Sequence, residues 1–278
     1  MWCEPNVCPI ECFTSFRFLP HAIIHVALFY IAALVIAVLK SLRCWPSPSA
    51  FDKRFADTFY VAWHCPVTLT SIPFSIMGLR GAYDLWVSGN VQQQFGNGSM
   101  SHPLITEAGV WFFTFIGVDT ILCVLHRMVD KEMLLHHAIF GLVCFLVTST
   151  CAFGITTAVL LSQELSTPFL NVFLLFRAFK GVDSSLTIVT FLAFSAFFYA
   201  VRVVLNSFAM LLFVRVLYSA LTGAPTVTMS SFEQGVMALL AVPLLAGQLL
   251  QLKWAKLIAT KIISAASGKK QEKPGKAD

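Results

Sequence analysis

The sequence predicts an all-α, polytopic membrane protein whose chain crosses the bilayer seven times. Only 12% of the 278 residues are Asp, Glu, Lys or Arg, and 57% are hydrophobic. Soluble domains carry about 25% charged residues, so this chain has too few to cover a surface in water. The formal net charge of +5 resides in short loops and a tail. Zinc-finger cysteine pairs, a Walker loop and a dinucleotide glycine fingerprint are all missing from the sequence, so we expect no nucleic-acid partner and no bound cofactor.

Seven apolar runs are long enough to cross the hydrocarbon core as an α-helix, which takes about 20 residues. The runs are Leu19–Leu39, Asp57–Leu79, Ala108–His126, Met133–Phe153, Ile155–Phe176, Leu186–Tyr218 and Phe232–Leu252. The sixth run is long, but two spans and a turn need about 40 residues or more, so it predicts one tilted helix. The first run follows a polar segment with Pro5 and Pro9. It is also longer than the apolar part of a signal peptide, which indicates a retained anchor.

Basic residues predict the orientation of these helices. Fifteen lysines and arginines flank the runs on one side, whereas only Arg17 and Arg80 flank them on the other. Cytoplasmic loops carry the excess of positive charge, which places residues 1–18 in the lumen as a tail and the C-terminus in the cytosol. The polar, lysine-rich segment 262–278 predicts a disordered basic cytosolic tail.

Two further features concern the side assigned to the lumen. Asn97 begins an Asn-Gly-Ser glycosylation sequon between the second and third runs. Cys3, Cys8 and Cys12 lie in the lumenal tail, where disulfides are permitted, but their odd number leaves the pairing open.

Five of the runs carry polar side chains at helical spacing along one face. In chain order these are His64, Thr68, Ser71 and Ser75; Asp119, Cys123 and His126; His137, Gly141, Cys144 and Thr148; Glu164, Thr167, Pro168 and Asn171; and Ser195, Tyr199, Arg202 and Asn206. Hydroxyl and amide groups also serve to pair helices, at about 0.6 kcal/mol each, and this explanation suits most of the Ser and Thr residues. Ionisable groups are too costly for that purpose. The stripes therefore predict a polar central cavity surrounded by lipid-facing apolar surfaces.

The depth of the ionisable residues divides this cavity into two layers. A rise of 1.5 Å per residue places four of them about 5 to 10 Å below the cytosolic ends of their helices. These four are His64, Asp119, His136 and His137. Glu164 and Arg202 lie nearer the midplane, where we expect them to form an ion pair because neither charge is stable there alone.

A layer of histidines with one carboxylate favours general-base chemistry. A neutral imidazole can accept a proton from a hydroxyl or amine, and a carboxylate can fix its tautomer, as acyl transfer to a lipid requires. Adjacent helical residues point about 100° apart. Because His137 continues into the stripe of Gly141 and Cys144, we expect His137 to face the cavity and His136 to face Asp119.

Two alternatives for the histidines remain. The pair could simply cap a helix near the interface. A metal site would need clustered ligands, and the only histidines at i, i+4 spacing are His21 and His25, which we place at the lumenal end of the first span. We therefore expect no metal site.

Two segments resemble the TLC domain, which is named from the TRAM, LAG and CLN proteins. Leu134–His137, after Asp130, carries the double histidine, and Glu164–Asn171 reads Glu-Leu-Ser-Thr-Pro-Phe-Leu-Asn. Three further residues match the pattern of this family, namely His64, Asp119 and Arg202. The resemblance covers about residues 51–261 and leaves the span at 19–39 as an N-terminal addition. It implies that six of the seven helices form a barrel in the endoplasmic reticulum, with a cavity for an acyl chain.

The resemblance also implies roles for individual residues. Ceramide synthases of this family transfer a fatty acyl group from acyl-CoA to a sphingoid base by means of paired histidines. Carried over, His136 and His137 are the catalytic pair, and Asp119 and His64 support them. The polar residues expected to line the lipid cavity are Glu164, Thr167, Asn171, Arg202 and Asn206.

This chain departs from ceramide synthases on the helix after the double histidine. Those enzymes carry a further His-Asp and Asp signature there, where this chain has Ser162–Pro168. The pattern is similar to the TLC-domain-containing branch, whose members are tied to phospholipid and ceramide composition.

Two functions follow from this resemblance. The first is acyl-CoA-dependent transfer of a fatty acyl chain to a membrane lipid, either a sphingoid base or a phospholipid. The second is non-enzymatic, a lipid-binding regulator of membrane composition or a trafficking factor. The expected partners are membrane lipids and fatty acyl-CoA, with acyl-CoA as a co-substrate. A seven-span receptor is disfavoured because the loops are short and the usual Asp-Arg-Tyr and Asn-Pro-x-x-Tyr motifs are missing.

Overall fold

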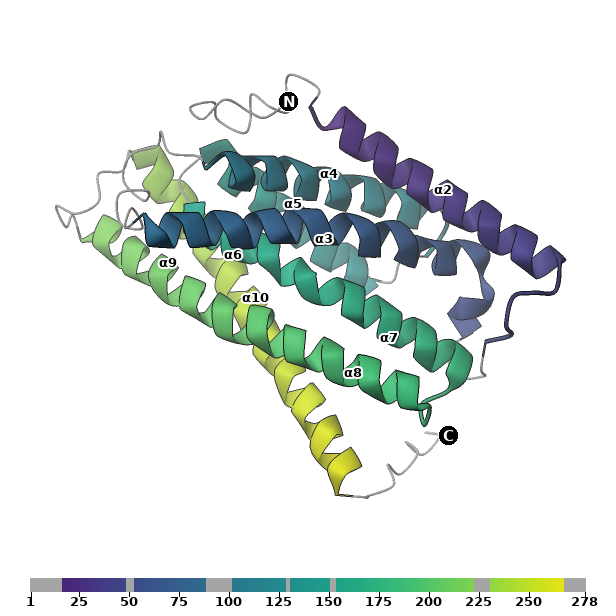
Figure 1. The fold of residues 1–278 in the computed structure, drawn as a ribbon. Helices are drawn as coiled ribbons and strands as arrows, with labels where there is room; N and C mark the ends of the chain where they lie inside the picture. The colour runs from purple at the N-terminus through teal and green to yellow at the C-terminus, as the bar shows by residue number, and fades with distance from the viewer. Residues whose placement is uncertain are drawn as a thin grey trace.

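The computed structural model describes residues 17–48, 53–88, 102–128, 131–150, 154–222 and 231–267, which form only helices and their connections. In order these are α2 (Leu19–Ser41), α3 (Thr58–Val87), α4 (Pro103–Leu125), α5 (Lys131–Thr150), α6 (Gly154–Ser162), α7 (Thr167–Lys180), α8 (Ser185–Phe197), α9 (Asn206–Leu221) and α10 (Ser231–Ala266). A 3₁₀ segment, Gln163–Ser166, joins α6 to α7, and a π-helical segment, Phe198–Leu205, joins α8 to α9 (Figure 1).

The described residues confirm the all-α prediction and contain a helix at each of the seven predicted runs. The sixth run is continuous from Ser185 to Leu221, which confirms the prediction of one long helix. Five of the described helical stretches are long and apolar enough to cross a membrane. They are Leu19–Ser41, Pro103–Leu125, Gly154–Lys180, Ser185–Leu221 and Gln234–Ser264. The chain is therefore a polytopic membrane protein with five candidate spans.

The other two predicted spans, α3 and α5, differ in composition or length. The helix α3 has 30 residues but buries His64, Thr70, Ser71 and Ser75. These polar side chains lower the mean hydropathy of α3. They face the protein interior and not the lipid. The apolar part of α5 is shorter and covers Met133–Val147.

Local signals explain where several helices begin and end. Asp57 caps α3, because its Oδ1 accepts hydrogen bonds of 2.7 and 3.0 Å from the amides of Phe59 and Tyr60. Pro103 begins α4, where the missing amide hydrogen costs nothing. Gly181 ends α7 with φ = +86°, a conformation that favours glycine.

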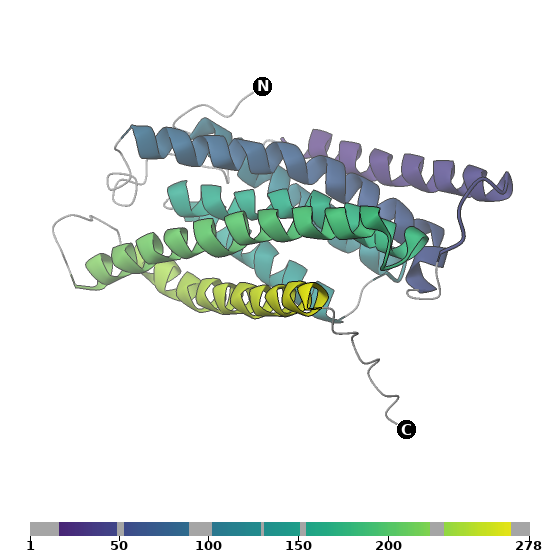
Figure 2. The same cartoon turned by 60° about the horizontal axis from the view of Figure 1, so that its bottom comes forward.

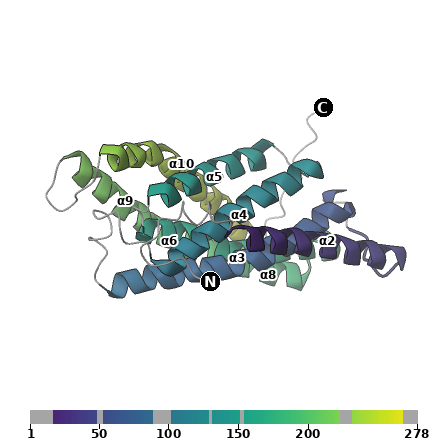
Figure 3. The ribbon, with the colours of Figure 1, turned by 90° about the horizontal axis from the view of Figure 1, so that it is seen from above.

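The helix α3 is at the centre of one half of the bundle and packs against α2, α4, α6 and α7. Viewed from above in Figure 3, α2 lies beside α3 and α4. The helix α10 packs against α5, α9 and the π segment, and Figures 1 and 2 show it on the opposite side of the bundle from α2. The first and last described helices therefore flank the bundle on opposite sides.

A close approach of α3 to α6 depends on one glycine. A Cβ atom added at Gly78 would lie 2.7 Å from the carbonyl oxygen of Ala158. Small residues at such positions let two helix backbones pack closely.

The outer surface of the bundle is apolar, as predicted for contact with lipid. Exposed large side chains occur on α2, α9 and α10, for example Leu34 (65%), Leu211 (70%) and Val242 (73%). Unpaired polar groups would be costly at this surface.

One prediction about the C-terminus needs correction. The segment 262–278 was expected to be disordered, but α10 continues to Ala266. The helix continues because Ile262 and Ile263 extend its apolar pattern beyond Lys261. Several other predictions concern residues outside the described ranges, namely Asn97, Asp130, Cys3, Cys8, Cys12 and the chain after residue 267.

Candidate functional site: a polar cavity within the helical bundle

A cavity of about 510 Å³ lies among α3, α4, α5, α7, the π segment and α10. Its polar lining consists of Arg54, Asp119, His136, His137, Glu164, Ser166, Thr167, Asn171 and Arg202. Its apolar walls include Phe115, Leu170, Phe194, Trp254 and Ile258. Clefts of this size, with apolar walls and a few convergent polar groups, are typical of small-molecule sites. Four of the five predicted polar faces contribute to this lining, through Asp119, His137, Arg202 and the group Glu164, Thr167 and Asn171. The predicted face of α3, from His64 to Ser75, does not contribute to it.

Asp119 lies at one edge of the cavity and has three aromatic or imidazole neighbours. It is 1% exposed. The indole Nε1 of Trp63 donates a hydrogen bond of 2.6 Å to Asp119 Oδ1. Nε2 of His137 lies 3.6 Å from Oδ2, and Nε2 of His25 lies 3.6 Å from Oδ1. These neighbours come from α3, α5 and α2, so Asp119 holds three helices together.

The predicted orientation of the double histidine is wrong in one respect: both histidines line the cavity, but His137 and not His136 faces Asp119. His137 is buried against α4, with Nε2 toward Asp119 and Nδ1 3.0 Å from Thr120 Oγ1. His136 is half-buried, lies 4.4 Å from the ring of Phe140 and lines the cavity. Glu164 and Arg202 line the same cavity as His136.

The stripe of small residues on α5 explains why His137 and not His136 faces Asp119. Gly141 and Cys144 were expected to leave room for a chain in the cavity beside His137. In the structure they face α4, where the Cys144 thiol lies 3.7 Å from the carbonyl oxygen of Gly109. A Cβ at Gly141 would contact Ile116 of α4 at 3.6 Å. The stripe is therefore a seam between two helices, and small residues are typical of such seams.

Glu164 and Arg202 form the predicted ion pair. Arg202 Nη2 donates to Glu164 Oε1 at 3.1 Å, and the hydroxyl of Thr167 donates to Glu164 Oε2 at 2.5 Å. Arg202 Nε also donates to Ser166 Oγ at 2.7 Å and to the Gln163 carbonyl oxygen at 3.2 Å. These bonds satisfy both charges, as a buried pair requires.

Two irregular helical segments create this ion pair. Glu164 and Ser166 belong to the 3₁₀ segment, and Arg202 belongs to the π segment. Pro168 follows the 3₁₀ segment and has no amide hydrogen with which to continue a regular ladder. Irregular turns inside long helices are often found at functional sites.

The structure does not place His64 in the lining of the cavity. Its ring lies 5.2 and 5.4 Å from those of Tyr60 and Phe55, and its Nδ1 is 2.9 Å from the Tyr60 carbonyl oxygen. Of the four residues predicted to share one layer, Asp119, His136 and His137 line the cavity and His64 does not. The residue beside His64, Trp63, contacts Asp119 instead.

Sequence reasoning missed Trp63 and His25 as neighbours of Asp119. A buried indole N–H requires an acceptor, so a tryptophan on a polar helix face was a usable signal for Trp63. His25 was assigned to the lumenal end of its span. In the structure, α2 is displaced along α4 relative to this expectation. As a result, His21 lies 3.1 Å from Glu107, and His25 lies close to Asp119. The sequence contains no signal of this shift.

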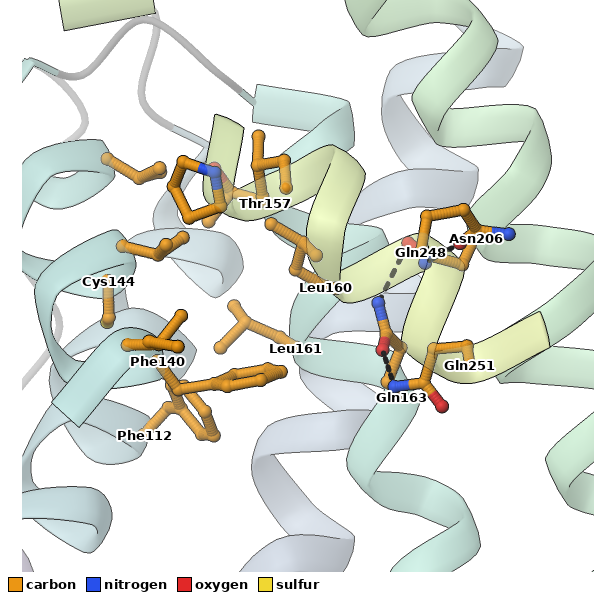
Figure 4. A pocket seen from close by; sticks show the side chains of 16 residues that line it. Phe112, Phe140, Cys144, Thr157, Leu160, Leu161, Gln163, Asn206, Gln248 and Gln251 are labelled. Carbon is orange, nitrogen blue, oxygen red and sulfur yellow. Dashed lines mark hydrogen bonds between the residues drawn. The ribbon is translucent and has the colours of Figure 1, made fainter. Parts of the chain in front are cut away.

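Asn206 was predicted to line the same cavity but lies at a second, smaller pocket of about 50 Å³ (Figure 4). The walls of this pocket include Phe112, Phe140 and Leu161. A row of amides closes one edge: Gln251 donates to Gln163, Gln163 to Asn206, and Asn206 to Gln248. Asn171 does line the main cavity, and its amide donates to Thr68 Oγ1 at 3.0 Å.

Comparison with known proteins agrees with this architecture. The family model of the TLC domain matches residues 21–260. The match begins within α2, so it includes the span that the resemblance alone left outside the domain. A search of curated protein sequences finds no match. The described helices, the double histidine at a polar cavity and this match together show that the chain belongs to the TLC-domain family.

Proposed function

We propose that the protein transfers a fatty acyl group from acyl-CoA to a hydroxyl or amine of a membrane lipid, either a sphingoid base or a phospholipid, with His136 as the general base. The observation that carries this proposal is the position of His136, a half-buried imidazole in the lining of a cavity of about 510 Å³. His137 serves a different purpose, since both of its ring nitrogens face protein atoms.

The proposed reaction balances through His136. Its imidazole accepts the proton of the lipid hydroxyl or amine while the oxygen or nitrogen attacks the thioester carbonyl. The carbon–sulfur bond breaks, an ester or amide bond forms, and the departing thiolate takes the proton from His136. The Glu164–Arg202 pair lines the same cavity as this ring and presents fixed dipoles to the developing charge.

The lining of the cavity suits both substrates of this reaction. Apolar side chains such as Phe194, Leu170 and Trp254 can contact an acyl chain. Arg54 also lines the cavity, and its guanidinium lies 5.0 Å from the centre of the Tyr60 ring. This cation supplies a partner for the phosphates of acyl-CoA.

The location follows from the distribution of charge. The fifteen-to-two split of flanking basic residues supports a lumenal N-terminus and a cytosolic C-terminus. The residues around His136 are then near the cytosolic face, from which acyl-CoA arrives. We propose the endoplasmic reticulum as the membrane in which the protein resides.

Lipidomics of cells that lack the protein tests the function. The cells are complemented with the wild type, with His136→Ala or with Leu135→Ala, whose side chain is 62% exposed on the same helix. We expect the wild type and Leu135→Ala to restore the lipid profile and His136→Ala, at equal protein level, to fail. Full restoration by His136→Ala would reject catalysis and favour a non-enzymatic lipid-binding regulator.

A further inference from the structure

The first helix contributes a buried imidazole to the polar site. His25 of α2 is 1% exposed, and its ring meets Phe115 edge-on at 5.4 Å. Its Nε2 lies 3.6 Å from Asp119 Oδ1, while Nε2 of His137 lies 3.6 Å from Asp119 Oδ2. One carboxylate therefore lies between two imidazoles at the same distance from each.

The opposite nitrogens of the two rings face threonine hydroxyls. His137 Nδ1 is 3.0 Å from Thr120 Oγ1, and His25 Nδ1 is 3.5 Å from Thr70 Oγ1. Thr120 donates its hydroxyl proton to the Ile116 carbonyl at 2.6 Å. Thr70 donates its proton to the Pro66 carbonyl at 2.7 Å.

Because both hydroxyl protons are donated to carbonyl oxygens, the tautomer of each imidazole is determined. A threonine hydroxyl has one proton, so each Oγ1 can offer the neighbouring imidazole only a lone pair. Nδ1 of both His25 and His137 must then carry the hydrogen. A neutral ring in this tautomer presents the lone pair of Nε2 to the carboxylate of Asp119, which repels it, whereas a protonated ring presents N–H and attracts it.

The number of protons follows from the charge of the site. Asp119 is almost fully buried, and a buried carboxylate needs one positive counter-charge. Among the described residues, two further neighbours are uncharged, namely the Trp63 indole and the Cys123 thiol, whose sulfur is 4.0 Å from Oδ2. Two cations line the same cavity: Arg202, which pairs with Glu164, and Arg54, whose guanidinium lies over the Tyr60 ring. Farther along α2 and α4, His21 pairs with Glu107 at 3.1 Å, and Nε2 of His126 lies 3.3 Å from the Tyr30 hydroxyl.

We propose that His25 and His137 share a single proton across Asp119, each ring carrying it part of the time. The effect of this sharing on His136, described next, rests on the proposed function. The rings of His137 and His136 are 5.9 Å apart, so a positive charge on His137 opposes proton uptake by His136. When the proton resides on His25, the charge lies at the other oxygen of Asp119 and no longer on the ring that is 5.9 Å from His136. His25 is thus a positioning residue that frees His136 to act as the base.

Ring-nitrogen NMR of the purified full-length protein, labelled with ¹⁵N-histidine and placed in lipid nanodiscs at neutral pH, tests the shared proton. In the wild type we expect the Nε2 signals of His25 and His137 to lie between the protonated and unprotonated values. In His25→Gln, His137 Nε2 should move fully to the protonated value. His21→Gln is the matched control one turn away and should leave His137 unchanged.

An unchanged His137 signal in His25→Gln would overturn the proposal, as would wild-type rings that are both neutral or both fully protonated. If His25→Gln does not fold, Asp119→Asn provides the second test. Loss of the carboxylate should leave both rings neutral, and rings that stay protonated would contradict the shared proton. These signals do not depend on lipid turnover, so the expected shifts combined with full lipid rescue by His136→Ala would reject acyl transfer alone.

Discussion

At the scale of single residues, the site is a set of charges that satisfy one another. Glu164 pairs with Arg202, and Asp119 lies between two imidazoles. His136 lines the same cavity as both groups, and its ring lies 5.9 Å from that of His137. Each group keeps its partners because an isolated charge in the interior of a membrane protein is costly.

The ion pair gives a prediction about protein level. Arg202→Gln leaves Glu164 buried without its counter-charge, a change that costs about 3–5 kcal/mol when one partner of a buried pair is removed. We expect Arg202→Gln to lower the amount of folded protein strongly. The double variant with Glu164→Gln should recover much of it, because no buried charge remains.

Quantitative blots of membrane fractions measure this effect. Arg80→Gln is the control, since Arg80 also pairs with a carboxylate, that of Asp84, but its side chain is 64% exposed. Equal levels of the single and the double variant would contradict a stabilising role for the pair.

The sequence predicted the ionisable residues of the site but not their orientation. An ionisable residue in a membrane span is energetically costly, so the sequence alone identifies Asp119 and Arg202 as candidate functional residues, whichever way their helices are turned. The choice between His136 and His137 depends on the rotation of α5 about its axis, and the seam against α4 decides it. Trp63 and His25 became neighbours of Asp119 only through the packing of α2 and α3.

At the scale of the helices, regular segments provide the frame and irregular segments provide the site. The spans α2 and α4 are regular, whereas the 3₁₀ segment Gln163–Ser166 and the π segment Phe198–Leu205 hold the buried ion pair. Apolar runs located all seven of the helical stretches that the structure describes. The two irregular segments lie inside continuous apolar runs, so hydropathy could not distinguish them from regular helix.

The contact between α3 and α6 gives a prediction about stability. Gly78→Ala places a Cβ 2.7 Å from the Ala158 backbone oxygen, which cannot rotate away. We expect a loss of about 1–3 kcal/mol and a lower melting temperature in detergent.

Gly117→Ala is the matched control for this variant, since a Cβ there meets nothing within 4 Å. Alanine also favours a helix over glycine by about 1 kcal/mol, so Gly117→Ala should be neutral or stabilising. Equal melting temperatures for Gly78→Ala and Gly117→Ala would contradict the prediction, because they would show that α3 and α6 can move apart without a loss of stability.

At the scale of the whole molecule, an apolar exterior encloses a polar interior built from all parts of the domain. Residues from α2 to α10 surround the cavity or its supporting contacts, and the family match likewise begins in α2. Exposed apolar side chains cover the outside of the described helices. Composition and charge predicted this plan, whereas the shift of α2 that adds His25 required the packed structure.

The orientation of the molecule can be tested in sealed microsomes. We expect Asn97 to face the lumen and a tag placed after Asp278 to face the cytosol, because fifteen basic residues flank the predicted spans on one side and only two on the other. Protease added outside should remove the tag, and Asn97→Gln should abolish a glycan-dependent shift in mobility. A tag that survives the protease while the membrane is intact would reverse the orientation.

Acyl transfer itself is measured most directly with the purified full-length protein in liposomes that contain sphingoid base and lysophospholipid acceptors, supplied with radiolabelled acyl-CoA. Loss of a general base typically lowers a rate by about 10²- to 10⁴-fold. We predict a labelled lipid product from the wild type and from Leu135→Ala, and a rate lower by that factor for His136→Ala. Equal rates for the wild type and His136→Ala would contradict the assignment of His136 as the catalytic base.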